Sequence, residues 1–381
     1  MKNRYLNILI PGICLPLFLG SVYNYSQYAK NIMSAFDITK FQADIGFTLI
    51  IFCLGFGAAL FGRFVELFPK RMAVVSTVLF AAGMLTMALS VYSSILPLYY
   101  IAAAMIGTAT GIGYTAPVKQ LLANFSNHKG MASGISICGF GTGKFVVAPV
   151  LEYLLANFSL HIVFLILAVI FLLVMGLATW LYVPNPAYVS TKYTIIPYRE
   201  LWKVKFLTKE YISIWFMFFV NITCGLALIS QEKGIFQEVG FTAIAALMAA
   251  TAVANVGGRF GMSTASDYIG RKGSYNIICT IGILGAFLCY TQNPFLLVAG
   301  ILFCEFAYGG NFSVLPSLLA KQFGESCLSS VHSMTLSGWG LAGISSVILT
   351  NIFTGNMLYL ILASLYLLGF LGFTICVKRK S

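Results

Sequence analysis

The chain has 381 residues, of which 59% are hydrophobic and only 9% are charged. Soluble domains carry about 25% charged residues, so this composition excludes an ordinary soluble protein. A formal net charge of +12 would also suit a nucleic-acid-binding protein. However, long uncharged runs recur along the whole chain, and they indicate an all-α protein that crosses a membrane many times. A transmembrane β-barrel is excluded because its strands would alternate polar and apolar residues.

Runs of about 20 apolar residues predict twelve membrane-spanning helices. The first run is taken as a span and not as a cleaved signal peptide, because more spans follow it. A long polar connection at 184–210, predicted to be a cytoplasmic linker, divides the chain into two halves of six helices, 1–183 and 211–381. In chain order the spans are predicted near 6–28, 42–62, 72–92, 96–122, 131–156, 161–183, 211–231, 241–265, 274–291, 295–320, 328–350 and 355–377.

The basic residues predict the orientation of these spans. With a cytoplasmic N-terminus, seventeen Lys and Arg residues fall in inner loops, three in outer loops and three inside spans, which accounts for all 23. Cytoplasmic loops of membrane proteins carry such an excess. We therefore expect both termini to be cytoplasmic and the protein to lie in the plasma (cell inner) membrane. Topology explains the net charge, and nucleic acid is not an expected partner.

Scattered cysteines, histidines and glycines give no sign of a cofactor. Most of the nine cysteines lie in apolar spans and none forms a C-x-x-C pair, so they are expected to be small buried hydrophobic residues and not disulfides or a metal site. Gly107 and Gly111 form a small-xxx-small pair that predicts close helix packing, not nucleotide binding. No arrangement of a nucleophile and a base at helical spacing predicts an enzyme.

One pattern of charges occurs twice. The second predicted span is followed by "GRFVELFPKR" (62–71) and the eighth by "STASDYIGRK" (263–272). Each has a small residue, an acid four positions later, a cation four positions after the acid, and one more cation. The repeat predicts charge-assisted latches between helix ends that open and close during a conformational cycle; the alternative is ordinary loop charge. The predicted gating residues are Arg63, Glu66, Lys70, Arg71, Asp267, Arg271 and Lys272.

Four segments carry a family resemblance: "GSVYNYS" (20–26), "GYTAPVKQLLANFSNHKGMASGISICGFGTGKFVVAP" (113–149), "NVGGRFGMSTASDYIGRK" (255–272), and "YGGNFSVLPSLLAKQFG" through "SGWGLAG" (308–343). With the two six-helix halves, they resemble the major facilitator superfamily, and within it the oxalate–formate antiporter family and its lactate-type relatives. The resemblance extends over nearly the whole chain. It departs at "NFS", where that family has Trp-Phe-Pro. It implies a transporter with its substrate site between two helical bundles near the midplane of the bilayer.

Arg259 is the only charge between 241 and 266. A charge at the bilayer centre costs about 2.5–3.5 kcal/mol on insertion scales, so Arg259 must face protein or a water-filled cavity. Asp267 lies eight residues further on, about 12 Å along a helix, which puts Arg259 near mid-membrane. Its planar guanidinium can hold a carboxylate bidentately, and Asn255, one turn away, could orient it. The resemblance implies that this arginine binds the substrate; the alternative is a structural ion pair with Glu305.

Three further charges lie inside predicted spans. Lys144, where the resembling family has a small residue, is expected to contact substrate, to pair with Glu305, or to extend to water. Lys119 is expected to extend toward the inner headgroups. Glu305, one turn before Tyr308, is expected either to carry a coupling proton or to form a fixed salt bridge.

Aromatic residues complete the expected site. The resemblance implies that they cage the substrate while phenol hydroxyls donate to its carboxylate; each tyrosine alone is more often a packing residue. The residues at the matching positions are Tyr23, Tyr25, Tyr114, Tyr308 and Trp339. In oxalate-transporting members a lysine occupies the position of Trp339, so the tryptophan favours a monocarboxylate such as lactate, pyruvate or formate. Lys144 could supply the second charge of a dicarboxylate site.

The sequence thus predicts a secondary transporter of small organic anions, which is expected to be a monomer in the lipid bilayer without cofactors. It works by alternating access, as proton symport or anion exchange, and the residues do not choose between these two. Two alternatives remain open. The first is a transporter of a non-acidic solute, such as a drug or a sugar, in which Arg259 is structural. The second is a receptor without transport activity.

Overall fold

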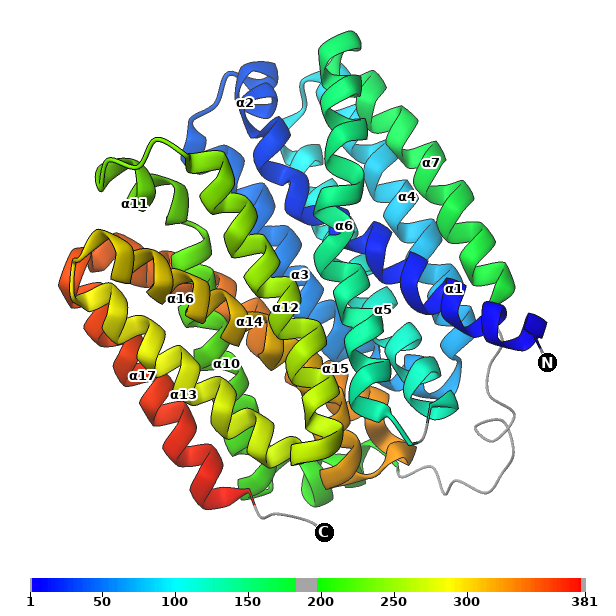
Figure 1. The fold of residues 1–381 in the computed structure, drawn as a ribbon. Coiled ribbons are helices and arrows are strands. Elements are labelled where there is room, and N and C mark those ends of the chain that lie inside the picture. The colour runs from blue at the N-terminus through cyan, green and yellow to red at the C-terminus, as the bar shows by residue number, and fades with distance from the viewer. Residues whose placement is uncertain (1, 126, 183–196, 378–381) are drawn as a thin grey trace. The chain divides into compact units, whose positions relative to one another are not determined.

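The structure is a computed structural model that describes residues 2–125, 127–182 and 197–377 (Figure 1). These ranges contain helices and no strands, so the all-α prediction is confirmed. The predicted linker 184–210 and the basic residues after 377 lie partly or wholly outside the described residues. The described chain forms two compact units: unit 1 comprises Met1–Ser126, Ile135–Thr194 and Ser326–Gly340, and unit 2 comprises Asn127–Gly134, Ile195–Glu325 and Leu341–Ser381.

Unit 1 contains most of the first half of the chain and one short helix from the second half. Its elements are α1 (Lys2–Leu19), the 3-10 turn η1 (Gly20–Asn24), α2 (Tyr25–Phe36), α3 (Lys40–Leu67), α4 (Pro69–Ser93), α5 (Leu96–Asn124), most of α6 (Lys129–Asn157), α7 (Leu160–Leu181) and α15 (Leu328–Thr335).

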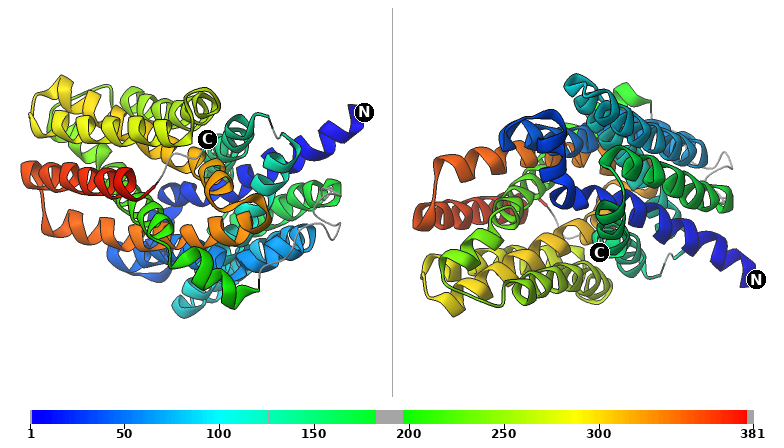
Figure 2. Two further views of the ribbon diagram at one scale, coloured as in Figure 1. Left: turned by 90° about the horizontal axis from the view of Figure 1, so that it is seen from below. Right: turned by 90° about the horizontal axis from the view of Figure 1, so that it is seen from above.

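Unit 2 contains the rest. Its elements are the first turn of α6, the short α9 (Tyr198–Leu201), the π-helical turn η2 (Trp202–Phe206), α10 (Lys209–Ile229), α11 (Glu232–Glu238), α12 (Ile244–Ile269), α13 (Arg271–Tyr290), α14 (Pro294–Phe323), most of α16 (Ser337–Ile352) and α17 (Gly355–Cys376). The turn η3 (Glu325–Cys327) begins at the last residue of this part of unit 2 and continues into unit 1. Within this unit α13 packs against both α14 and α17, and Figures 1 and 2 show these helices side by side.

Eleven helical segments in the described ranges are long and apolar enough to cross a membrane. They correspond to eleven of the twelve predicted spans. The eighth predicted span is occupied by α12, a helix of 26 residues that is about 39 Å long at 1.5 Å per residue. The first span is longer than predicted, Leu6–Phe36. It is interrupted at Gly20–Asn24, where Gly, Ser and Asn lower the helix propensity.

Close contacts between backbones shape unit 1. A Cβ atom added at Gly107 would lie 2.3 Å from the Ile50 carbonyl oxygen, and one added at Gly111 would lie 2.1 Å from that of Leu54. Only glycine fits at such distances, so α5 lies directly against the backbone of α3. The predicted small-xxx-small packing is confirmed.

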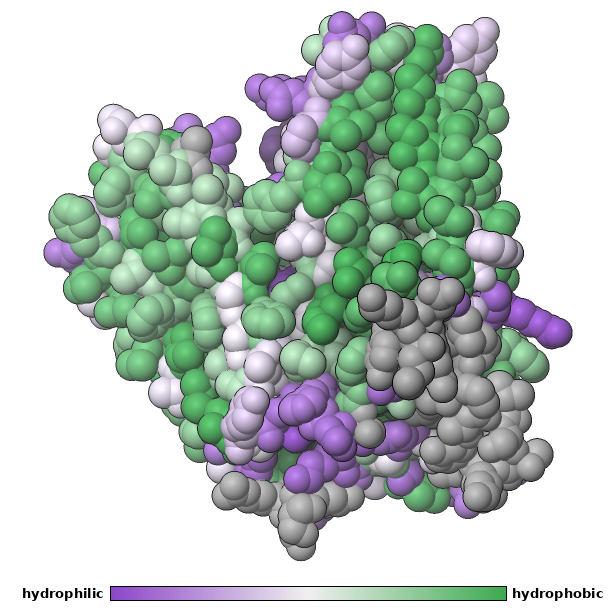
Figure 3. All heavy atoms as spheres, turned by 45° about the vertical axis from the view of Figure 1, so that its right-hand side comes forward, coloured by the Kyte–Doolittle hydropathy of each residue, from purple (hydrophilic) through white to green (hydrophobic). Residues whose placement is uncertain are grey.

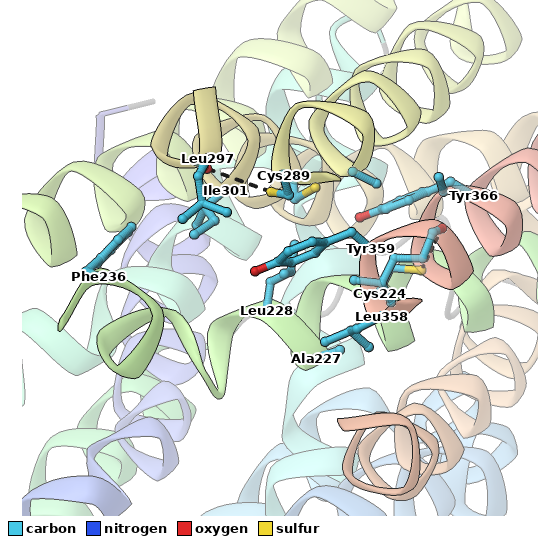
Figure 4. Close-up of a cluster of buried hydrophobic side chains, with 14 residues drawn as sticks. Cys224, Ala227, Leu228, Phe236, Cys289, Leu297, Ile301, Leu358, Tyr359 and Tyr366 are labelled. Atoms are coloured by element: carbon cyan, nitrogen blue, oxygen red, sulfur yellow. Dashed lines mark hydrogen bonds between the residues drawn. The ribbon is translucent and has the colours of Figure 1, made fainter. Parts of the chain in front are cut away.

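The core of unit 2 shows how the cysteines are used. Cys224, Cys289 and Cys304 are buried together with Tyr366 among leucine, isoleucine and alanine side chains (Figure 4). The Cys289 thiol donates a 3.7 Å hydrogen bond to the Leu297 carbonyl oxygen. As predicted, these thiols behave as small hydrophobic groups in the core.

The outer faces of α4 and α7 in unit 1 carry exposed apolar side chains that include Val78, Leu89, Leu173 and Leu177. Green areas of this kind cover much of the surface in Figure 3. Soluble proteins rarely expose such large apolar areas. These faces therefore suit contact with lipid chains.

Candidate functional site

Arg259 is buried in α12 of unit 2, with 2% of its surface exposed. Its Nε donates a 2.8 Å hydrogen bond to Oδ1 of Asn255, one turn earlier. The Asn255 Nδ2 in turn donates a 2.7 Å hydrogen bond to Oε2 of Glu305 on α14, which is 4% exposed. The prediction that Asn255 orients the guanidinium is confirmed. The amide also joins the arginine to the carboxylate, so the three groups form one polar chain.

Two glycines bring α12 and α14 close enough for this chain to form. A Cβ atom at Gly258 would lie 2.0 Å from the Phe306 carbonyl oxygen, and one at Gly309 would lie 2.0 Å from that of Asn255. Glycine at position 258 therefore lets the backbone of α14 approach α12 directly. Gly257 differs, because the nearest atoms of Phe306 would be 4.0 Å from an added Cβ atom and a side chain would fit there.

An aromatic ring lies near the guanidinium of Arg259 and contacts two further rings. The Arg259 Cζ atom lies 5.4 Å from the centroid of the Phe312 ring, a distance at which the ring attracts a cation. Phe312 contacts Tyr308 at 5.1 Å and Phe218 at 5.3 Å between centroids. Sequence reasoning found Tyr308 but missed Phe312 and Phe218. The spacing of seven residues from Glu305 could have indicated Phe312, because i and i+7 share a helix face.

A second aromatic cluster lies in unit 1 around Tyr114. The Tyr114 ring centroid is 5.1 Å from that of Phe140, 5.8 Å from that of Trp339 and 5.9 Å from that of His332. Phe140 also contacts Trp339 at 5.7 Å and Tyr23 at 5.5 Å. The structure therefore brings together the predicted residues Tyr23, Tyr114 and Trp339. It adds Phe140 and His332, which sequence reasoning did not assign to the site.

Tyr25 lies elsewhere in unit 1. Its ring stacks on Phe47 at 5.2 Å, and its hydroxyl donates a 3.3 Å hydrogen bond to Oδ1 of Asp44, which pairs with Lys40. Within the described part of unit 1, no ring contact joins Tyr25 to the cluster around Tyr114. Its predicted contact with substrate stays a prediction.

The two lysines inside predicted spans differ in environment. Lys144 on α6 is half-buried, and no carboxylate among the described residues of unit 1 forms an ion pair with it. Lys119 on α5 is 4% exposed and forms a buried salt bridge with Glu66. The prediction that Lys119 extends to the headgroups was wrong, because its side chain is buried against Glu66. The sequence did not indicate this pair, since the two residues lie 53 positions apart.

The two repeated acids occupy equivalent positions at helix starts. In unit 1, Oε2 of Glu66 accepts a 2.8 Å hydrogen bond from the backbone N–H of Ser330, in the first turn of α15. In unit 2, Asp267 accepts hydrogen bonds of 2.9 and 3.0 Å from the backbone N–H groups of Gly130 and Met131, in the first turn of α6. The first N–H groups of a helix lack intrahelical partners and favour negative charge. Each acid therefore caps a helix.

One cation of each segment contacts a helix end, but from different positions of the repeat, because Lys70 corresponds to Arg271 and Lys272 corresponds to Arg71. Lys70 donates a 3.1 Å hydrogen bond to the Trp180 carbonyl oxygen near the end of α7, and Lys272 donates one of 3.0 Å to that of Thr374 near the end of α17. Cations favour the C-terminal ends of helices. Arg271 donates a 2.5 Å hydrogen bond to Asp267. The contacts that recur at matching positions are therefore the helix caps made by Glu66 and Asp267.

The two remaining predicted gating residues are Arg71 and Arg63. Arg71 is exposed, and its guanidinium carbon lies 5.4 Å from the centroid of the Phe68 ring. Arg63 is half-buried on α3.

Comparisons with known proteins agree with this architecture. Residues 11–347 match the family model of the Major Facilitator Superfamily. The chain is 27% identical to the uncharacterized MFS-type transporter YhjX of Escherichia coli, over 90% of this chain and 86% of that protein. It is 22% identical to the oxalate:formate antiporter of Oxalobacter formigenes, over 100% of this chain and 93% of that protein. It is 24% identical to the apicoplast pyruvate carrier 1 of Toxoplasma gondii, over 76% of this chain and 67% of that protein.

Solved structures show the same fold at lower sequence identity. A variant of the fucose:proton symporter FucP of E. coli superposes with a TM-score of 0.80 at 14% identity, over 100% of both chains. A bacterial homologue of the iron transporter ferroportin superposes with a TM-score of 0.77 at 13% identity, also over 100% of both chains. The helical architecture and the match over most of the chain lead to one conclusion: this multi-pass membrane protein belongs to the Major Facilitator Superfamily of secondary transporters.

Proposed function

We propose that the chain transports small organic anions, preferably a monocarboxylate such as lactate, pyruvate or formate, and that Arg259 binds the carboxylate. The observation that carries the proposal is a guanidinium buried in α12, the helix of the eighth predicted span, with Nε held by Asn255. Burying a charge is expensive unless function or pairing compensates it. A fixed guanidinium presents its fork in one orientation, which suits the planar carboxylate.

The relatives support an acidic substrate. Two of them are named for carrying oxalate and formate or pyruvate, which are all small carboxylates. Preference for a monocarboxylate rests on Arg259 as the one buried arginine among the described residues and on Trp339, because the resembling oxalate transporters have a second cation at that position. The dicarboxylate alternative keeps Lys144 as the second cation, and the absence of a carboxylate partner for Lys144 in the described part of unit 1 keeps it open.

Glu305 is the proposed coupling group. The Asn255 amide connects its carboxylate to Arg259, so a change of charge at one end alters the field at the other. If Glu305 takes up a proton when substrate binds, the protein is a proton symporter. If only substrate balances the charge of Arg259, the protein is an anion exchanger.

Alternating access requires contacts that form and break. We propose the helix caps made by Glu66 and Asp267 as these contacts, with Lys70, Arg271 and Lys272 in support. Arg63 and Arg71 remain proposed gating residues on the evidence of the repeat alone. We also propose that both termini are cytoplasmic, that the protein lies in the plasma membrane, and that it is a monomer.

Counterflow in proteoliposomes tests the proposal. A panel of labelled mono- and dicarboxylates, with glucose as the neutral control, is measured with and without a pH gradient. We expect uptake of at least one monocarboxylate and its loss in Arg259→Ala protein that stays monodisperse in detergent. Uptake of a neutral solute and of no acid would favour the alternative in which Arg259 is structural. Stimulation by an inward proton gradient separates symport from exchange.

A further inference from the structure

Asn24 is a buried amide at the interruption of the first span. It is the last residue of η1 and the N-cap of α2, and 1% of its surface is exposed. Asparagine is a preferred N-cap residue because its side-chain oxygen accepts a hydrogen bond from the first turn of the helix, usually from an extended backbone. The Asn24 side chain makes no such bond, and its ψ angle of 3° is not extended. Helix capping therefore does not account for this amide.

The polar atoms of this amide have no partner among the described residues. Both Oδ1 and Nδ2 of Asn24 are buried without a hydrogen bond to any described group. Burial of an amide without hydrogen bonds is unfavourable, and buried polar atoms in native proteins nearly always pair with the protein, a water or a ligand. The amide therefore indicates a partner that is not a described residue of the chain.

Asn24 lines a small cavity inside unit 1. The cavity has a volume of about 20 Å³, and a water molecule needs at least about 10–15 Å³ of such space. Its walls come from η1, α2, α3, α4, α5, α6 and α7, which supply apolar side chains such as Ile50 and Phe80. Among the described residues that line it, Ser21 and Tyr28 are the other polar ones. They lie three residues before and four residues after Asn24, so the three residues share one side of the chain.

Close backbone contacts hold the interruption beside α6. A Cβ atom at Gly20 would lie 2.0 Å from the Phe140 carbonyl oxygen, and one at Gly143 would lie 2.1 Å from that of Leu17. Side chains at these two positions would force the end of α1 and the start of η1 away from α6. The place of Asn24 beside the cavity therefore follows from backbone packing within unit 1.

The lining of the cavity selects a small neutral partner. The described residues that line it include no charged side chain, so an ion there would lack a compensating charge in apolar surroundings, which is expensive. A water molecule fits the volume and can both donate to Oδ1 and accept from Nδ2 of Asn24. Buried waters make about three hydrogen bonds, and the hydroxyl of Ser21 on the same lining can supply a further one.

We propose that this cavity binds one water molecule, which pairs with both polar atoms of the Asn24 amide and has the Ser21 hydroxyl as a further partner. The water satisfies the amide at the point where the first span is interrupted, so the interruption is stable inside the apolar core of unit 1. This site lies within unit 1 and does not depend on which solute the protein carries or on the role of Arg259.

Hydroxyl-radical footprinting tests the proposal, because an X-ray pulse converts a bound water into a radical that oxidises the nearest side chains. Met84 lines the cavity, although only 8% of its surface is exposed. Met87 lies one turn later on α4, is 1% exposed and is not among the lining residues, so it is the matched control. Oxidation of both methionines is measured by mass spectrometry in wild-type protein and in Asn24→Leu, Asn24→Ser and Asn24→Ala. The Ser and Ala variants differ only by one hydroxyl group.

We expect Met84 to be oxidised and Met87 to be spared in wild-type protein. Met84 oxidation should persist in Asn24→Ser and be lost in Asn24→Leu and Asn24→Ala, because apolar cavities stay dry. Equal oxidation of Met84 in the Ser and Ala variants would overturn the role of Asn24. A wild-type Met84 that is no more reactive than Met87 would overturn the water site itself. If Asn24→Leu is not monodisperse in detergent, the Ser and Ala pair still decides.

Discussion

The close contact of α12 and α14 gives a sharp prediction for Gly309. A Cβ atom at this position would lie 2.0 Å from the Asn255 carbonyl oxygen, whereas ordinary contact begins near 3.4 Å. Gly309→Ala must therefore move the two helices apart locally by about 1.4 Å. A shift of that size exceeds what the 2.7 Å hydrogen bond between Asn255 and Glu305 can absorb, since such bonds weaken beyond about 3.2 Å.

The magnitude follows from two opposing effects. Overpacking of a helix contact costs about 1–3 kcal/mol, and replacing glycine by alanine in a helix gains about 1 kcal/mol. The net loss for Gly309→Ala, and likewise for Gly258→Ala, is therefore up to about 2 kcal/mol. Gly257→Ala is the matched control, because its Cβ would lie 4.0 Å from the nearest atoms. Gly257→Ala therefore gains helix propensity without a steric clash between α12 and α14.

Thermal unfolding in detergent, followed with a thiol-reactive dye, measures these effects. The buried thiols of Cys224, Cys279, Cys289 and Cys304 in unit 2 react only when this unit opens. One kcal/mol corresponds to about 2–4 °C in a domain of this size. We expect Gly309→Ala and Gly258→Ala to unfold below wild type, by up to about 8 °C, and Gly257→Ala to unfold at or above it. Equal midpoints for Gly257→Ala and Gly258→Ala would refute the reasoning.

Three further predictions concern single charges. Lys119→Met leaves the buried Glu66 without its cation and should cost about 3–5 kcal/mol, seen as a large fall in the unfolding midpoint; a midpoint within 1–2 °C of wild type, as a rough bound, would contradict the buried pair. Asp267→Asn weakens the cap of α6 and should cost about 0.5–1 kcal/mol, measured in the same assay at low salt; no change would show that the cap does not stabilise the fold. Lys144→Met should lower dicarboxylate counterflow more than monocarboxylate counterflow, and a greater loss of monocarboxylate uptake would contradict a single-cation site for monocarboxylates.

Hydropathy predicted most of the fold because each span is a local property of the sequence. The positions of the helices follow the apolar runs, and α12 matches the eighth run although it carries Arg259. Interruptions within a helix were not predicted. The 3-10 turn at Gly20–Asn24 and the end of α15 before Leu336 occur inside runs that are apolar enough to read as one helix. Hydropathy averages over such a window and does not report helix continuity.

The candidate site was predictable where its contacts are local. Asn255 and Arg259 are one turn apart, so their hydrogen bond follows from helical spacing. The partners of Lys119 and of Glu66 lie 53 and 264 positions away, and spacing within one helix contains no information about them. The repeat indicated that Glu66 and Asp267 are equivalent. It did not indicate that each one caps the first turn of another helix.

The most direct test of the account is a binding measurement on Arg259. The Kd of purified protein is measured for the acid that gives the strongest counterflow and for its neutral amide, with wild-type protein and with Arg259→Gln. A hydrogen bond to a charged group contributes about 1.5–3 kcal/mol, or about a 10- to 100-fold change in Kd. The account predicts that wild-type protein prefers the acid by at least this factor and that Arg259→Gln loses the preference. An Arg259→Gln protein that still binds the acid with wild-type affinity would contradict the central claim.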